Sequence, residues 1–289
     1  MEILLLHLLA GLTLGATYAL VAVGLSIVFG VVRLVNFAHG ELYMLGSYLL
    51  VWLYVDHDIP YGLAVLLAML GMAILGGVFE RVVVRPVLSR TWRTQLIATI
   101  AASIVISNVA ILIWGTYPKM APTPLSIAVL RAGPVNISYQ RLLILGITIG
   151  TFLLLSLFIA HTKMGKAMRA VSQNRDACTV YGIDVKQVSS VTFVIGSGLA
   201  ALAGALITPL TSVYPSVGSA ITLKALAAVV MGGFGQISGV IYAALILGFA
   251  ESLFAGYVSF AYRDVAAFVI MILVLLLRPY GLFHRKVGL

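Results

Sequence analysis

Long apolar segments, separated by short polar stretches, run through the whole chain. A helix needs about 20 apolar residues to cross a membrane. The pattern therefore predicts an all-α, polytopic membrane protein with about eight to nine transmembrane segments, including broken or re-entrant helices, in one domain over residues 1–289. The predicted segments lie at about 5–32, 42–55, 61–80, 95–116, 140–160, 188–210 and 264–278, with a glycine-interrupted region at about 221–257.

The region 221–257 predicts a broken pair of helices. An even number of crossings is needed between the basic loop that ends near Lys186 and a tail on the same side. Thr222–Gly233 is too short for a full crossing at about 1.5 Å per residue. Irregular backbone at membrane depth is tolerated where it is buried in protein or lines a wet cavity. We expect the break at Gly232, Gly233 and Gly235.

A similar interruption follows the first apolar segment. Two interrupted segments in corresponding halves of a chain point to a transport path. The predicted interruption is made by Asn36, His39, Gly40 and Glu41.

The composition excludes a soluble protein. The chain is 62% hydrophobic and 9% charged, whereas a soluble domain is about 25% charged. The net charge of +9 is spread along the chain, so no nucleic-acid partner is expected. The first apolar run has no basic region before it, which favours a retained membrane helix over a cleaved signal.

The distribution of Lys and Arg predicts the orientation in the membrane. With the N-terminus outside, the cytoplasmic side receives one basic residue after the first segment and four at positions 81–93. It also receives five in the loop at about 161–187 and three in the tail, from a total of 18. The C-terminus is then cytoplasmic.

No catalytic or metal site is predicted. A phosphate-binding loop needs G-x-x-x-x-G-K-[ST], and Met164-Gly165-Lys166-Ala167 lacks its first glycine and its hydroxyl. If ATP powers the protein, another chain must hydrolyse it. His39 and Glu41 lie two positions apart and point in different directions on a helix. They are either hydrated or hydrogen-bonded groups at a membrane boundary or, with Asn36, braces of a helix break near the path.

Two ionisable residues, Lys224 and Glu251, interrupt apolar segments, where such groups are costly. Lys224 is expected to extend to the outer surface. Glu251 is expected to form an ion pair, with Arg263 or with a neighbouring subunit, more readily than to bind a solute.

The loop at about 161–187 has the features of a docking element. Asn174 is a suitable N-cap, Asp176 suits the first turn, and Gly182 suits a C-terminal stop. Ala177, Val180 and Tyr181 form a small apolar face on a short helix. The alternative is a solvated basic loop that merely satisfies the charge bias.

Four stretches together resemble one family along nearly the whole chain. They are GLTLGATYALVAVGLSIVFGVVRLVNFAHGELYMLGSY (11–48), KMGKAMRAVSQNRDACTVYGIDV (163–185), KALAAVVMGGFGQISGVIYAALILGFAES (224–252) and LLLRPYGLF (275–283). They are similar to LivH-type permeases, the membrane subunits of bacterial ATP-binding-cassette importers for branched-chain amino acids. The stretch NFAHGE is the most specific.

The resemblance implies a multi-pass permease of the bacterial cytoplasmic (inner) membrane that is not itself an enzyme. It implies a heterodimer with a second related permease, two cytoplasmic ATPase subunits that use ATP and Mg, and a periplasmic substrate-binding protein. It also identifies the loop as the ATPase-coupling loop. The alternative function is a secondary transporter or channel for a small solute. The coupling residues expected on this basis are Met168, Asn174, Arg175, Asp176, Ala177, Val180, Tyr181 and Gly182.

Overall fold

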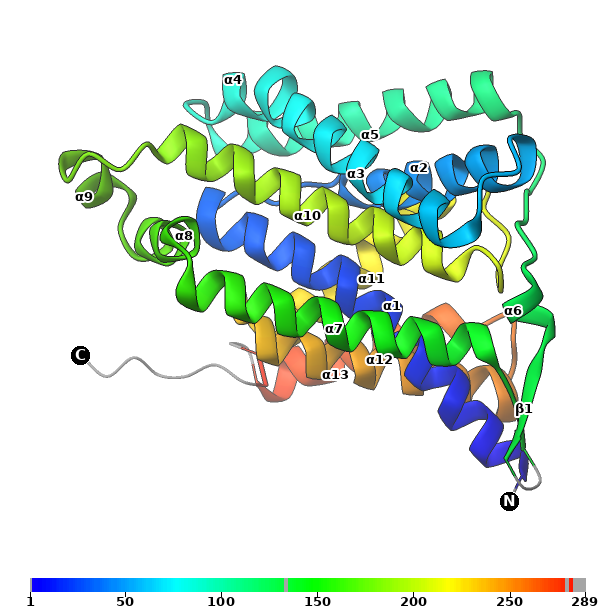
Figure 1. The fold of residues 1–289 in the computed structure, drawn as a ribbon. Coiled ribbons are helices and arrows are strands. Elements are labelled where there is room, and N and C mark those ends of the chain that lie inside the picture. Colours follow the sequence, from blue (N-terminus) through cyan, green and yellow to red (C-terminus); the bar gives the residue numbers. More distant parts are fainter. Residues whose placement is uncertain (1, 133–134, 279–280, 283–289) are drawn as a thin grey trace.

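The computed structural model describes residues 2–132, 135–278 and 281–282, and within these it is a bundle of long helices (Figure 1). Six of the described helices are long and apolar enough to cross a membrane. The first half of the chain forms α1 (Glu2–Val32), α2 (His39–Val51), the π-helical turn η1 (Trp52–Asp56), α3 (Tyr61–Phe79), the π-helical turn η2 (Glu80–Val84), α4 (Arg85–Val87) and α5 (Trp92–Trp114).

The second half continues the bundle after a short irregular connection. Its elements are α6 (Pro124–Ile127), β1 (Val129–Ala132), β2 (Val135–Ser138), α7 (Tyr139–His161), α8 (Lys163–Gln173), α9 (Arg175–Val180), α10 (Val185–Ile207), α11 (Val217–Gly232), α12 (Ile237–Tyr257) and α13 (Arg263–Leu277). The all-α prediction is confirmed, with one small addition: β1 and β2 pair as an antiparallel hairpin.

The helices α1 and α10 form the centre of the bundle. Apolar side chains gain little from leaving lipid, so helices in a membrane associate by close packing of their backbones. Small residues allow the backbones to approach each other. A Cβ on Gly24 would collide with the backbone of Gly196, and one on Gly46 with Ala201. In contrast, α5 and α7 expose many Leu and Ile side chains, as expected for helices that face lipid.

The loops collect at two opposite ends of the bundle. One end, which we call the basic end, holds Arg33 and the basic loop 161–187. There Arg33 donates to the carbonyl oxygens of Ser172 and Gln173, at 3.4 Å each, so the end of α1 meets the end of α8. The hairpin end holds β1, β2 and the start of α1 (Figure 1). At the basic end, the Leu282 amide donates to the Met231 carbonyl oxygen at 2.8 Å.

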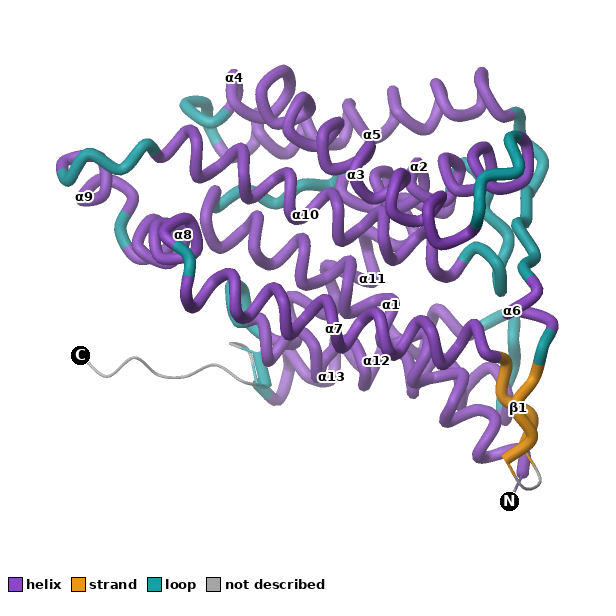
Figure 2. Tube along the Cα trace, viewed as in Figure 1, coloured by secondary structure: helices purple, strands orange, loops and turns teal. Residues whose placement is uncertain are grey.

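Two helices begin inside the bundle rather than at an end. Residues 33–38 run from the end of α1 back into the bundle (Figure 2), and α2 starts there at His39. The first two turns of α11 meet the first turn of α2: the Gly40 amide donates to Thr222 Oγ1 at 2.9 Å, and a Cβ on Gly40 would collide with the Gly218 carbonyl oxygen. The internal break in the second half of the chain therefore precedes Val217.

The glycine cluster that was expected at an internal break lies elsewhere. Gly232, Gly233 and Gly235 form the turn between α11 and α12 at the basic end, where Gly235 lies beside Gly30 of α1. Gly233 and Gly235 have φ of +97° and +76°, values that favour glycine. The prediction placed this turn too deep in the bundle, because α11 starts at Val217 and has 16 residues, several more than expected.

Candidate functional site

The junction of α2 and α11 is closed by buried polar groups. Asn36, His39 and Glu41 are all inaccessible to solvent or nearly so. Asn36 Oδ1 accepts from the Ala38 amide at 3.1 Å, and His39 Nε2 donates to the Val21 carbonyl oxygen at 3.1 Å. Burial excludes hydration of these groups, whereas their hydrogen bonds agree both with hydrogen-bonded groups and with braces of a helix break. These side chains hold the irregular backbone that precedes α2.

Glu41 connects this junction to α5. Ser103 Oγ of α5 donates to Glu41 Oε1 at 2.8 Å. The other carboxylate oxygen packs against Gly218, where a Cβ would collide with it. Outside this contact, a groove of about 430 Å³ runs between α5 and the start of α11, and Ser103, Ser107 and Asn108 line it. Polar groups thus occupy one face of an otherwise apolar helix.

Lys224 lies in a buried charge network that links four helices. Its Nζ contacts Glu251 Oε1 at 2.9 Å and Asp264 Oδ1 at 2.9 Å, and it donates to Tyr18 OH at 3.2 Å. Tyr18 OH donates in turn to Glu251 Oε2 at 2.7 Å. The expected extension of Lys224 to the surface is wrong. The expected ion pair of Glu251 exists, but its partner is Lys224 and not Arg263.

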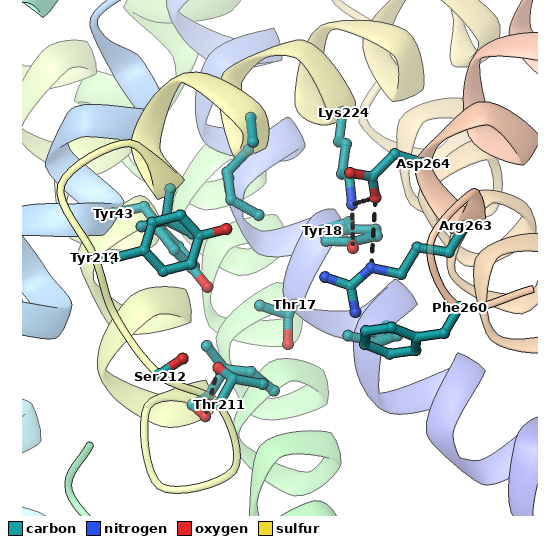
Figure 3. A pocket seen from close by; sticks show the side chains of 15 residues that line it. Thr17, Tyr18, Tyr43, Thr211, Ser212, Tyr214, Lys224, Phe260, Arg263 and Asp264 are labelled. Atoms are coloured by element: carbon teal, nitrogen blue, oxygen red, sulfur yellow. Dashed lines mark hydrogen bonds and ion pairs between the residues drawn. The ribbon is translucent and has the colours of Figure 1, made fainter. Parts of the chain in front are cut away.

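The network forms one wall of a cavity of about 310 Å³ (Figure 3). The cavity lies toward the hairpin end, between α1, the connection from α10 to α11, the first turns of α11, and the start of α13. Figure 3 shows Lys224, Asp264 and Arg263 on one side and Tyr43 and Tyr214 on the other. Other lining residues include Leu14, Thr17, Ile207, Val217, Ala220, Ile221 and Phe260.

The loop 161–187 forms two helices at the basic end. α8 lies against the bundle: Met168 and Val171 are buried, and Gly165 packs on the backbone of Phe158 and Ile159. Met168 was expected to take part in coupling, and its burial places it beneath the exposed surface. It supports the loop and is not available for a direct contact.

α9 projects away from the bundle (Figure 1). Asn174 Oδ1 accepts from the Ala177 amide at 3.0 Å, and Gly182 has φ of +78°, so the predicted cap and stop are present. Val180 and Tyr181 are each 85% exposed, whereas Ala177 is half-buried. The apolar face therefore points outward, and Arg175, Asp176 and Gly182 flank it.

Among the members of these sites that sequence reasoning missed, three show why. Tyr18 lies within an unbroken apolar run and gives no local signal of its buried partners. Thr222 contacts α2 from 182 positions away along the chain. Asp264 is a charge at a helix start, and its pairing with Lys224 is set by packing. The signal available in the sequence was an acidic residue at the start of an apolar segment, in a chain with two other charged residues inside such segments.

Known proteins resemble the chain over nearly its full length. A family model described as the permease component of branched-chain amino acid transport systems matches residues 7–275. The high-affinity branched-chain amino acid permease LivH of Salmonella typhimurium is 35% identical over 95% of this chain and 94% of its own length. BraD of Pseudomonas aeruginosa is 37% identical over 96% and 95%.

A more distant similarity covers part of the chain. The ribose import permease RbsC of Escherichia coli is 35% identical over 40% of this chain and 39% of its own. No solved structure matches the chain.

Proposed function

Because the chain belongs to the family of permease components of branched-chain amino acid transport systems, we propose that it is the membrane-spanning subunit of an ATP-driven importer of branched-chain amino acids. The observation that carries this proposal is the similarity, along nearly the whole chain, to permeases named for that transport. The internal starts of α2 and α11 support it, because such interruptions occur where a bundle holds a path.

The proposed partners follow from the same family. Two ATPase subunits use ATP and Mg and dock on α9, a related permease completes the pore, and a periplasmic binding protein delivers the solute. α9 suits docking because Val180 and Tyr181 are exposed on a capped helix, whose base is held by Arg33 and the buried face of α8.

The function is tested by reconstituting the chain in liposomes with its partner subunits and measuring uptake of labelled leucine. We expect uptake that requires ATP on the side of the liposome membrane where the ATPases lie and that stops when the ATPases are omitted. Uptake of equal rate without ATPases would contradict the proposal and favour the secondary transporter or channel.

The role of α9 is tested with Tyr181→Ala, for which the chain offers a matched control. Tyr117 is 84% exposed and lies at the opposite end, so Tyr117→Ala removes an equally exposed ring. Tyr181→Ala should reduce co-purification of the ATPases and uptake about tenfold, since a few aromatic side chains carry most of an interface. It should leave the unfolding free energy within about 0.5 kcal/mol. Equal effects of the two variants would show that α9 is not the docking site.

We also propose that the basic end faces the cytoplasm and the hairpin end faces outward, in the inner membrane. Cys178 is replaced first, and single cysteines are then introduced. An impermeant reagent should label sites at Asp56 and Pro122 from outside and spare sites at Arg90 and Arg175. Labelling in the reverse pattern would invert the orientation.

A further inference from the structure

Arg263 and Asp264 present two partly exposed charged groups to the cavity. Asp264 Oδ1 lies 2.9 Å from Lys224 Nζ and 3.5 Å from Arg263 Nε, so its contact with Arg263 is the looser of the two. The Asp264 side chain is 53% exposed and that of Arg263 is 42% exposed.

The guanidinium is held in place. Its Cζ lies 4.6 Å from the centre of the Phe260 ring, a cation–π distance. Figure 3 shows it extending from the start of α13 across the cavity. A planar, partly exposed guanidinium suits a carboxylate, which it can bind through two parallel hydrogen bonds. The partly exposed carboxylate of the neighbouring Asp264 suits an ammonium group.

The rest of the cavity lining is mixed, and the cavity is of limited size. Leu14, Val217 and Ile221 give it an apolar part, beside hydroxyl-bearing side chains such as Thr17 and Tyr214. Its volume of about 310 Å³ lies at the lower end of the range for small-molecule sites, roughly 300–1,000 Å³.

We propose that this cavity is a binding site for a free α-amino acid with an apolar side chain. Arg263 binds the carboxylate, the Asp264 carboxylate binds the ammonium group, and Leu14, Val217 and Ile221 contact the side chain. Lys224 and Glu251 neutralise each other beside the site, and Lys224 holds Asp264 in place. This inference rests on the proposed function and adds to it a solute site within the permease itself, on the hairpin side of the α2–α11 junction.

The test uses the permease complex in nanodiscs without the binding protein, and three probes of similar shape. Leucine carries both charged groups, leucinamide lacks the carboxylate, and 4-methylpentanoate lacks the ammonium group. We expect saturable leucine binding in the millimolar range, at least about tenfold tighter than binding of either analogue, because each analogue leaves one charge unpaired.

Two variants test which charged residue binds which group of the amino acid. Arg263→Gln should weaken leucine binding about tenfold and leave leucinamide binding unchanged, because leucinamide makes no carboxylate contact. Asp264→Asn should weaken leucine binding and leave 4-methylpentanoate binding unchanged, while its amide oxygen still accepts from Lys224. Lys119→Gln removes a cation from the same end outside the cavity and is the control, with all three affinities as in the unmodified protein.

Ala220→Phe gives a test that does not depend on the charged residues. A ring at this position fills the cavity, so it should weaken binding of leucine more than binding of alanine. Equal affinities for the three probes, or unchanged leucine binding in Arg263→Gln, would overturn the proposal.

Failure of this site is distinct from failure of the proposed function. A complete complex that takes up leucine with ATP, in which the permease alone shows no saturable binding at up to about 10 mM leucine, refutes the site and leaves the function standing. A complete complex without ATP-driven uptake refutes the function itself.

Discussion

α2 and α11 both begin inside the bundle, yet their surroundings differ. The backbone before α2 is enclosed, and its polar neighbours Asn36, His39 and Glu41 are buried and bonded to protein atoms. The connection before α11 borders the cavity, and Lys224 on α11 reaches Asp264, which is half exposed there. Irregular backbone in a membrane protein survives either by internal bonding or beside a wet cavity. One chain uses both solutions.

This difference assigns different tasks to the two regions. The start of α2 is a fixed part of the core, where a change should first affect stability. The start of α11 forms a wall of the cavity, where a change can affect solute binding as well. The residues that join the two regions, Gly40 and Thr222, should affect both.

The largest effect is expected from Lys224→Met. It leaves Glu251 buried and without its cation, and breaking a buried ion pair costs about 3–5 kcal/mol of unfolding free energy. Denaturant titration of the purified protein measures this. The double variant Lys224→Met with Glu251→Gln should recover most of the loss, because no uncompensated buried charge remains. If the unfolding free energy of Lys224→Met lies within about 1 kcal/mol of that of the unmodified protein, the charged groups around Lys224 are solvated.

A smaller loss, about 3 kcal/mol, is expected from Gly40→Val. A Cβ at Gly40 would collide with the Gly218 carbonyl oxygen and with Thr222, so the two helix starts must separate. Gly146→Val is the control, because a Cβ at Gly146 of α7 meets no atom within 4 Å. Thermal unfolding compares the two variants. Equal melting temperatures would show that the junction is not tightly packed.

The smallest effect is expected from Thr222→Val, which keeps the shape and removes the hydroxyl. The Gly40 amide then loses its acceptor, at a cost of about 1–3 kcal/mol. Thr192→Val is a matched control, since that buried hydroxyl bonds only to the Val188 carbonyl oxygen of its own helix among the described residues. If the two variants lose equal stability, the bond between the halves adds nothing beyond the loss of a buried hydroxyl.

Features that depend on neighbouring residues were predicted well. The helix-length segments, the cap at Asn174 and the stop at Gly182 are confirmed. Apolar length, N-cap chemistry and tolerance of positive φ act over a few residues and can be recognised without the fold. The roles expected for Asn36, His39, Gly40, Glu41 and the α9 residues remain predictions, although their positions are now described.

Features that depend on distant residues were not predictable. The depth of the glycine turn was misjudged because small and hydroxyl-bearing residues at 216–222 resemble a loop. In the bundle, that stretch is helical from Val217, and its Thr222 accepts a hydrogen bond from Gly40 of α2. Lys224 was assigned to the surface for a similar reason. Its partners Tyr18, Glu251 and Asp264 lie 206, 27 and 40 positions away, so spacing along the chain cannot identify them.

The amino-acid sequence by itself determined that this protein spans a membrane, where its helices lie to within a few residues, and how the exposed loop helix α9 is capped. Each of these follows from the transfer of apolar segments out of water and from local backbone chemistry. Only the tertiary structure decided that two helices start inside the bundle, that Lys224 is neutralised there, and that Arg263 and Asp264 face a cavity. Buried charges and internal helix starts are stable only when groups from other helices satisfy them, and only the packed bundle brings those groups together.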